Sequence, residues 1–462
     1  MRRFAVRIAV LALVAVALQP RRAQAQGYGV YEHDACTMAR AGTGVASPCN
    51  ASAIFFNPAG IIVPTSPTKW NISIGATSIG ADFAFADSVT GTTTPSAGGS
   101  VLVPNVHITR QLSPRWAVGL GVFAPYGLVS EWPEQDFAGA FLGYRSELKS
   151  IYIQPTVAWQ VKPWLSLGAG FDYIHSSVDL QQLVDLSEQR ATATATFGQL
   201  GIPRGTEFAD AHLTGGSWSA AFHLGVLLKP TEHVSLGVRY LSRGRADIQG
   251  NGEFTQIMTG IVLGPGNPLC TGACVPGTPL DTVLAGQFRG TGSLTTQHVS
   301  TSVPLPDQLV IGTTITPTPK LRVLIDFQWV NWSKFSKLVL TFERLPQRTL
   351  WEDYNDTRAI RFGTEYDLTE RFTVRGGLLF HEGAAPEQTR TPLLPEAERA
   401  EQTIGLGIRV GSRGRIDLAY QHINQATKRG RITDAPRFST ANNTGVYSGS
   451  ANLFGASLAW GF

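Results

Sequence analysis

Four cysteines are the residues whose type and spacing point most directly to chemistry: Cys36, Cys49, Cys270 and Cys274. Cys270 and Cys274 enclose three residues, a spacing that suits either metal ligation or a disulfide. No histidine or further cysteine lies near this pair, so a loop disulfide is favoured over a metal site. An even number of cysteines in an exported chain also favours disulfides. We expect Cys36 to pair with Cys49, although spacing alone does not fix the geometry.

Charged side chains on predicted strands offer a second kind of chemistry. If they face the inside of a barrel, they either guide a carboxylate ligand or form salt bridges that fix the wall, and we favour the salt bridges. The residues concerned are Arg239, Asp326, Arg375, Arg409, Arg415 and Asp417. The nine histidines are scattered, without the paired spacing of metal ligands. We therefore expect no metal site and no cofactor.

The sequence lacks the motifs of common enzymes. It contains no G-x-S-x-G, no H-E-x-x-H and no glycine-rich phosphate loop. Neighbouring Ser and His residues, as at His175-Ser176, have no nucleophile turn around them. We predict that the protein is not an enzyme and has no catalytic residues, with an outer-membrane lipid hydrolase as an alternative.

The composition favours a β-rich chain. Charged residues make up 16% of the sequence, against roughly 25% in a typical soluble domain. Aromatic residues make up 10%, and there are 49 glycines. Beyond the first twenty residues or so, no segment offers the roughly 18 consecutive apolar residues of a spanning helix. A helical membrane protein and a disordered chain are both excluded.

The N-terminus has the pattern of a secretory signal. Residues 2–7 are rich in arginine, residues 8–18 are apolar, and residues 23–25 read Ala-Gln-Ala, an A-x-A cleavage pattern. Removing residues 1–25 takes away five arginines and no acidic residue, which changes the net charge from +4 to −1. The mature chain therefore gives no reason to expect a nucleic-acid partner.

Alternating hydrophobicity recurs along the chain and predicts strands. In residues 151–161, one face carries Ile151, Ile153, Pro155, Val157, Trp159 and Val161. The same alternation occurs in residues 116–123, 371–381 and 414–422. The strands of a soluble β-sandwich would show the same alternation. The connections between strands must therefore decide whether the outer face of the sheet meets water or lipid.

Short and long connections alternate strictly, which is typical of a bacterial outer-membrane barrel. The short turns are 112–116, 161–165, 228–234, 316–321, 367–372 and 411–415. The long polar stretches are 85–100, 125–146, 181–211, 249–294, 344–356, 382–399 and 425–449. Seven outer loops and six inner turns give fourteen antiparallel strands. Pro304 and Pro306 predict a kink in the eighth strand, and the aromatic residue Phe462 ends the chain as in barrel insertion signals.

Residues 26–68 do not alternate and are rich in Ala, Gly and Ser. They form either a disordered periplasmic tail or a plug inside the barrel. The apolar residues Tyr28, Phe55 and Phe56 favour the plug. We therefore expect a signal peptide in 1–25, a plug or hatch in 26–68, and an all-β transmembrane barrel in 69–462.

Several segments resemble, in order and spacing, the FadL/TodX family of outer-membrane transporters for fatty acids and other hydrophobic compounds. The most specific is residues 53–59, whose Asn57-Pro58-Ala59 looks like the family's hatch motif. The others are residues 126–128, 305–307 and 330–335, and Pro386 with residues 394–399.

The resemblance implies a monomeric fourteen-stranded barrel in the bacterial outer membrane, closed by an N-terminal hatch. It also implies capture of fatty acids or aromatic hydrocarbons by outer loops, passive diffusion to an interior pocket, and sideways release through a kinked third strand into outer-membrane lipid. A porin for small polar solutes is the alternative. The family's carboxylate-binding residues cannot be assigned here, so the cargo stays open.

The predicted third strand carries a candidate exit. Pro125 lacks a donor for the strand ladder, and Gly127 supplies no side chain and permits unusual φ. Together they predict a bend and a gap in the wall, lined by Phe123, Tyr126 and Leu128. Alternatively, the strand simply ends there at the outer rim.

Overall fold

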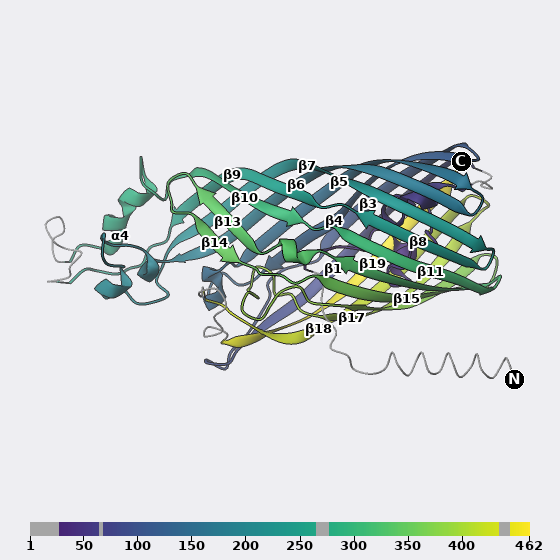
Figure 1. Cartoon of the computed structure of the whole chain (residues 1–462). Helices are drawn as coiled ribbons and strands as arrows, with labels where there is room; N and C mark the ends of the chain where they lie inside the picture. The colour runs from purple at the N-terminus through teal and green to yellow at the C-terminus, as the bar shows by residue number, and fades with distance from the viewer. Residues whose placement is uncertain (1–26, 64–67, 265–276, 434–443) are drawn as a thin grey trace.

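The computed structural model describes residues 27–63, 68–264, 277–433 and 444–462, and shows a closed β-barrel around an N-terminal plug (Figure 1). The predicted signal in residues 1–25 lies outside the described residues, as do Cys270 and Cys274. Within the described ranges, no helix has the length and apolar character needed to cross a membrane.

Fourteen antiparallel strands span the barrel in chain order, as predicted. The first six are β1 (Trp70–Asp87), β3 (Val101–Ser113), β4 (Trp116–Glu131), β5 (Arg145–Lys162), β6 (Leu165–Asp185) and β7 (Glu207–Thr231). The last five are β15 (Thr357–Asp367), β16 (Phe372–His381), β17 (Arg399–Val410), β18 (Gly414–Gly430) and β19 (Gly445–Gly461). The barrel closes where β19 pairs with β1 from Asn71↔Gly461 to Asp87↔Gly445, which joins the first and last strands of the sheet.

The seventh, eighth and ninth spanning strands are each broken into two elements. They comprise β8 (Val234–Leu241) with β9 (Gly244–Gln256), β10 (Gln297–Leu305) with β11 (Gln308–Thr318), and β12 (Leu321–Val330) with β13 (Lys337–Phe342). The predicted kink of the eighth strand is confirmed, because Pro304 and Pro306 supply no N–H at the break. The break in the ninth strand holds η7 (Trp332–Lys334), and β2 (Thr93–Pro95) and β14 (Arg348–Trp351) are short additions to β1 and β13.

The predicted alternation sets which side chains face lipid. On β5, Ile151, Val157 and Trp159 are exposed, whereas Tyr152 and Gln154 are buried toward the lumen. This pattern follows from the bilayer, which replaces the protein core as the apolar surroundings of the outer face.

The alternation of short turns and long loops is confirmed, but several strands run further into the loops than predicted. β4 continues to Glu131, so the third strand does not end at the kink, and β7 already begins at Glu207. The loops themselves carry η2 (Ala138–Phe141), η3 (Leu186–Glu188), η4 (Gly198–Leu200), α4 (Leu280–Leu284) and η6 (Ala285–Phe288). The polar, glycine-rich composition of these segments predicted loops. Such residues can nevertheless extend a pair of strands beyond the membrane.

Residues 27–63 form the plug, and the alternative of a disordered tail is wrong. The plug contains α2 (Ala35–Met38), α3 (Ala53–Phe56) and η1 (Pro58–Ile61). Most of its side chains are buried, and η1 packs against β5, β6 and β7 while α2 packs against β17, β18 and β19. The plug therefore bridges opposite parts of the wall.

Candidate functional site

The barrel wall opens between β3 and β4. These strands pair from Ser113↔Trp116 to Val106↔Val122 and no further. Beyond that point, Val101–Asn105 pairs with β1, and the rest of β4 pairs with β5. The third strand thus separates from the second while staying attached to the fourth.

The break occurs at the predicted Pro125 kink. The β4–β5 register shifts between Phe123 and Tyr126, which marks a bulge. Plug residues take the place of β3 at this edge: the Val30 N–H donates to the Pro125 carbonyl at 2.9 Å, and the Gly127 N–H donates to the Tyr28 carbonyl at 2.9 Å. The plug therefore satisfies backbone groups that the missing strand pairing leaves free.

A hollow of about 350 Å³ lies at this gap, and we call it the wall hollow. Its mostly apolar lining includes Val101, Leu102, Tyr126, Gly127, Leu128 and Leu148. Neither Phe123 nor Pro125 belongs to the lining: Phe123 is buried behind it, and Pro125 contributes its carbonyl to the plug. Gly127 does not adopt a positive φ, so its contribution here is space rather than unusual backbone conformation.

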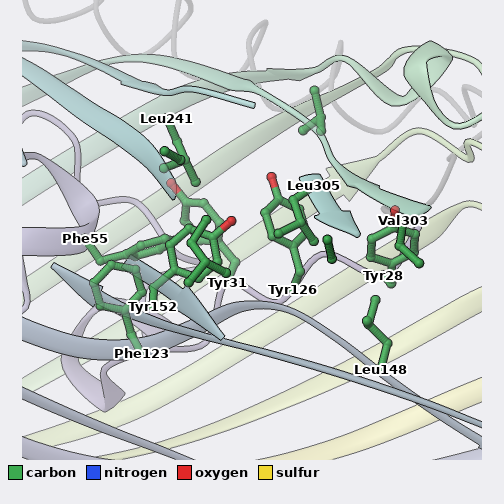
Figure 2. Close-up of a cluster of buried hydrophobic side chains, with 14 of the residues drawn as sticks. Tyr28, Tyr31, Phe55, Phe123, Tyr126, Leu148, Tyr152, Leu241, Val303 and Leu305 are labelled. Carbon is green, nitrogen blue, oxygen red and sulfur yellow. The ribbon is translucent and has the colours of Figure 1, made fainter. Parts of the chain in front are cut away.

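An aromatic cluster backs the wall hollow (Figure 2). Tyr28 of the plug lies edge-on to Trp332 at 4.6 Å and to Tyr126 at 6.1 Å between ring centroids. Deeper in the lumen, Phe55 meets Phe123 at 5.2 Å and Tyr31 at 5.3 Å. The predicted apolar plug residues Tyr28, Phe55 and Phe56 are all buried in this cluster.

Hydroxyl groups tie the aromatic cluster to the broken eighth strand. The Tyr28 hydroxyl donates to the Pro304 carbonyl, and the Tyr126 hydroxyl donates to the Pro306 carbonyl. Tyr126 also accepts from the Gln308 amide at 2.7 Å. The kinks of the third and eighth strands therefore lie close together beside the plug and are linked by hydrogen bonds.

The remaining family-like segments converge on the same place. Asn331 donates to the Asp307 carboxylate at 3.0 Å, which joins the segments at 305–307 and 330–335. The Glu396 carboxylate accepts from the backbone N–H groups of Gly27, Ala384 and Ala385 at 2.8–3.0 Å. Sequence reasoning noted these segments only as resemblances and gave Glu396 and Trp332 no role, since their partners are distant in the chain.

The Asn57-Pro58-Ala59 turn anchors the plug to the wall. The Asn57 side-chain oxygen accepts from the Ala59 N–H at 3.1 Å, and its amide donates to the carbonyls of Val45 at 2.6 Å and Val226 at 3.0 Å. Pro58 begins η1, where its fixed φ suits a helix start. One side chain thus joins two parts of the plug and β7.

Paired glycines let this turn approach the wall. Gly168 of β6 and Gly225 of β7 are register partners beneath the turn. A Cβ at Gly225 would lie 2.2 Å from Asn57 Oδ1, and a Cβ at Gly168 would lie 2.3 Å from the backbone of Pro58 and Ala59. Any side chain at either position would displace the turn.

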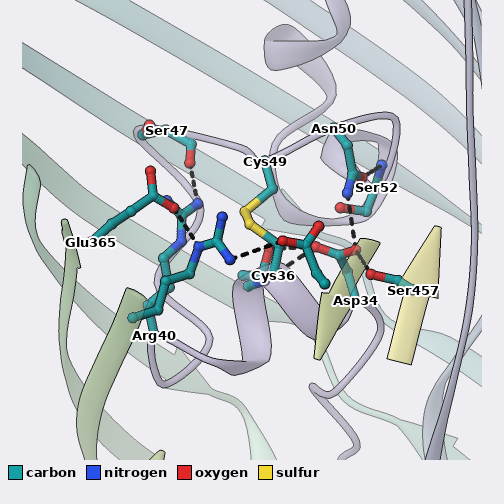
Figure 3. Close-up of a disulfide and its surroundings, with 12 residues drawn as sticks. Asp34, Cys36, Arg40, Ser47, Cys49, Asn50, Ser52, Glu365 and Ser457 are labelled. Atoms are coloured by element: carbon teal, nitrogen blue, oxygen red, sulfur yellow. Dashed lines mark hydrogen bonds and ion pairs between the residues drawn. A yellow bond between two sulfur atoms is a disulfide. The ribbon is translucent and has the colours of Figure 1, made fainter. Parts of the chain in front are cut away.

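A disulfide links Cys36 to Cys49 inside the plug, as predicted (Figure 3). Asp34 lies beside it, accepting from Asn50 at 3.0 Å and from Ser457 of β19 at 3.1 Å. Asp34, Cys36 and Cys49 form the only cluster of metal-type ligands in the described part of the chain, and the disulfide occupies both sulfurs. The predicted Cys270–Cys274 disulfide lies outside the described residues.

Lumenal charges form salt bridges within the wall and hydrogen bonds to the plug, in agreement with the interpretation that we favoured. Asp326 accepts from the Gly44 and Val45 N–H groups of the plug, and Arg239 donates to the Phe55 carbonyl. Asp417 binds Arg375 and Arg415, each at 2.8 Å. Arg409 faces the same side of the wall as its register partner Arg415, but it is exposed near a short turn and donates to the Glu370 carbonyl instead of forming a salt bridge.

The plug residue His33 lies near the lumenal charge Arg239. His33 is fully buried, 4.3 Å from the ring of Phe55. Burial, with His107 and Arg239 nearby, lowers the pKa of His33 to about 3. The imidazole is therefore neutral at physiological pH, as a packed plug requires.

Comparison with known proteins places this architecture in a family. A family model described as outer membrane protein transport protein (OMPP1/FadL/TodX) matches residues 15–462. A long-chain fatty acid transport protein of Escherichia coli O157:H7 is 24% identical over 479 residues, covering 97% of each chain.

Two solved structures share the fold. A Pseudomonas aeruginosa FadL homologue has a TM-score of 0.79 at 18% identity, covering 95% of this chain and 100% of that one. The Ralstonia pickettii toluene transporter TbuX has a TM-score of 0.65 at 20% identity, covering 94% of this chain and 99% of that one.

Proposed function

The chain belongs to the OMPP1/FadL/TodX family of outer-membrane transport proteins, and on that premise we propose that it takes up long-chain fatty acids or aromatic hydrocarbons by passive diffusion. Outer loops capture the cargo, the wall hollow receives it, and it leaves sideways between β3 and β4. Its immediate partners are the hydrophobic cargo and outer-membrane lipid, and it works as a monomer that leaves its cargo chemically unchanged. Residues 1–25 serve as the export signal, residues 26–68 as the hatch and residues 69–462 as the barrel.

The observation that carries the proposal is the apolar wall hollow at an interruption of strand pairing. An intact ladder has no room for a solute, whereas here β3 and β4 diverge and only plug residues 28–30 and side chains fill the space. An apolar lining suits an apolar cargo, because transfer from water supplies about 0.8 kcal/mol for each buried methylene. The scheme requires neither a nucleotide nor an ion gradient.

The anchored plug supports a path by which the cargo leaves sideways through the wall, rather than straight through the plug to the periplasm. Asn57, the paired Gly168 and Gly225 beneath its turn (the glycine seat), and the charged lumenal side chains fix the plug to several strands. The Cys36–Cys49 disulfide links two parts of the plug. Passage to the periplasm would have to break these contacts, whereas sideways exit need displace only the plug residues at the β4 edge.

Exposed apolar residues on the outer loops support capture. Met258 and Val262 in the connection between β9 and β10 are 71% and 59% exposed, and Val283 of α4 is 45% exposed. Beneath them, Leu280, Leu284 and Phe197 pack in a buried cluster. A surface of this kind can hold an apolar solute before it enters the barrel.

The proposed exit is tested by Gly127→Trp. A Cβ at Gly127 meets no atom closer than 3.6 Å, so the barrel should fold while the indole fills the wall hollow. Gly376→Trp is the matched control, since a Cβ there also meets nothing closer than 3.6 Å and β16 is remote from the gap. We expect about tenfold slower uptake of a fluorescent fatty acid for Gly127→Trp only, equivalent to about 1.4 kcal/mol in the barrier. Equal uptake by both variants at matched surface expression would place the exit elsewhere.

A further inference from the structure

The wall bends inward where the seventh, eighth and ninth spanning strands are broken. Pairing of β7 with β8 ends at His223↔Leu241, and pairing with β9 resumes only at Gly216↔Gln249. Between these points Gly244 approaches the lumenal side chains of Ile174 and Leu305, since a Cβ there would lie 3.1 Å and 3.3 Å from them. The inward displacement leaves a hollow of about 900 Å³ on the outer face.

We call this hollow the outer-wall groove, defined by Arg243, Arg245, Asp247, Ser302, Lys334 and Lys337. It shares no lining residue with the wall hollow. Four of its lining residues are cationic, and Asp247 is its single carboxylate. Four cations and one carboxylate give the groove a formal charge of +3.

Most of this positive charge is not neutralised by the protein. Arg245 binds Asp247 at 2.7 Å and Ser302 at 2.8 Å. Within the described ranges, Arg243, Lys334 and Lys337 have no carboxylate within 4.0 Å, and the Lys337 ammonium lies 5.7 Å above the ring of Trp351. All three are exposed on the outer face of the wall.

Trp218 indicates where the groove lies relative to the membrane. On β7, Trp218 lies between Gly216, where pairing with β9 resumes, and Phe222, whose N–H binds Ser242. Trp218 is 56% exposed and stacks on Tyr173 at 4.5 Å. Exposed aromatic pairs of this kind mark the membrane interface of a barrel, here on the side of the long loops. Cations at this level of the wall meet the headgroups of the outer leaflet.

We propose that the outer-wall groove binds the phosphate of a phosphorylated glycolipid of the outer leaflet. Arginine offers paired donors to phosphate, and lysine adds compact charge. Cations on the lipid face of a barrel cost free energy unless they lie near the interface or are neutralised. A phosphate in the groove offsets much of the positive charge of Arg243, Lys334 and Lys337, and Ser302 also lines the groove. The binding is separate from cargo transport.

The test compares lipid binding by two variants that lose the same charge. The groove variant is Arg243→Gln/Lys334→Gln/Lys337→Gln. The control is Lys162→Gln/Lys229→Gln/Lys320→Gln, whose exposed lysines lie at the short turns. Native mass spectrometry of the detergent-solubilised protein would measure binding of diphosphorylated lipid A and of the same lipid after enzymatic dephosphorylation. Altered migration of unheated samples on a denaturing gel would verify folding.

We expect the groove variant to bind diphosphorylated lipid A at least about tenfold more weakly than the control does. We also expect dephosphorylation to weaken binding to the wild-type protein similarly. Equal binding by both variants, or binding that ignores the phosphates, would overturn the proposal. So would complete displacement of the lipid by an equimolar amount of inorganic phosphate, since that would identify a site for the free ion. If the triple variant does not fold, Lys334→Gln alone should still weaken binding measurably, and unchanged binding would again overturn the proposal.

Discussion

The barrel wall departs from a regular ladder in two regions, and different groups fill them. Between β3 and β4, apolar side chains and plug residues 28–30 occupy a gap that connects with the lumen. Across β9, β10 and β13, the wall bends inward, and cations line a groove on its outer face. Prolines mark both regions: Pro125 in the first, and Pro304 in the second.

The difference shows that a broken ladder alone does not decide what a site binds. Each proline removes one N–H, which loosens pairing in both regions. At the first gap the neighbouring side chains are apolar and the plug supplies replacement hydrogen bonds, so the site suits an apolar solute. In the second region, charged side chains face the membrane interface, so the site suits an anionic headgroup.

The largest expected effect is on the plug side, from Gly225→Val. Its Cβ would overlap Asn57 Oδ1 at 2.2 Å, so the Asn57 turn would lose its seat. We expect the plug to be destabilised by about 3 kcal/mol, with faster hydrogen exchange in peptides from residues 27–63 and leakage of a polar dye. Gly376→Val, which meets nothing closer than 3.6 Å, should change neither. Wild-type exchange in Gly225→Val would show that the glycine seat is dispensable.

Asn57→Ala should have the next largest effect. It removes the hydrogen bonds to Ala59, Val45 and Val226 while leaving the wall intact, at a cost of about 2 kcal/mol. We expect slower uptake of a hydrophobic tracer by a barrel that assembles normally. Asn424→Ala, an exposed change on β18, serves as the control. Unchanged uptake would reduce the Asn57 turn to a packing detail.

The plug should also loosen in acid because of His33. Its pKa in the folded protein is about 3, below the ordinary 6.5, so the unfolded plug binds more protons between these values. The contribution of His33 is therefore complete above pH 6.5 and falls by about 2 kcal/mol on going to pH 5. Hydrogen exchange of plug peptides should accelerate more between pH 7.5 and 5 in the wild-type protein than in His33→Leu, after correction for intrinsic rates. Equal acceleration in both would exclude His33 as the titrating group.

Tyr126→Phe should give the smallest effect. It removes the hydroxyl that joins the third strand to Pro306 and Gln308, for a loss of about 1 kcal/mol. Exchange should rise locally in residues 123–128, with little change elsewhere in the barrel. Tyr152→Phe is a close control, because the buried Tyr152 hydroxyl has no hydrogen-bond partner among the described residues. Equal responses would mean that the Tyr126 bonds do not hold the gap.

Local patterns in the sequence predicted much of the fold. Alternation identified the lipid-facing side chains, connection lengths gave the strand number, and Pro125 with Gly127 marked the place where β4 leaves β3. These features could be predicted because each depends on a few adjacent residues and on the fixed period of a strand.

Features that depend on distant partners could not be predicted. Plug residues 28–30 pair with β4, and Glu396 binds the N–H of Gly27, but nothing near either residue in the sequence indicates its partner. Phe123 was expected to line the gap, yet it precedes the bulge and faces the lumen. The cations of the outer-wall groove come from two strand breaks, β8–β9 and β12–β13, that lie about 90 residues apart in the chain, so only the folded wall brings them together.

Lateral exit through the β3–β4 gap is tested most directly by a reversible block at Gly127. In Gly127→Cys, a bulky reagent that forms a mixed disulfide would fill the wall hollow, and mild reductant would remove it. Uptake of a fluorescent fatty acid should fall on labelling and recover on reduction, while Gly376→Cys treated in the same way stays unchanged. Undiminished uptake by fully labelled Gly127→Cys would contradict lateral exit at this gap.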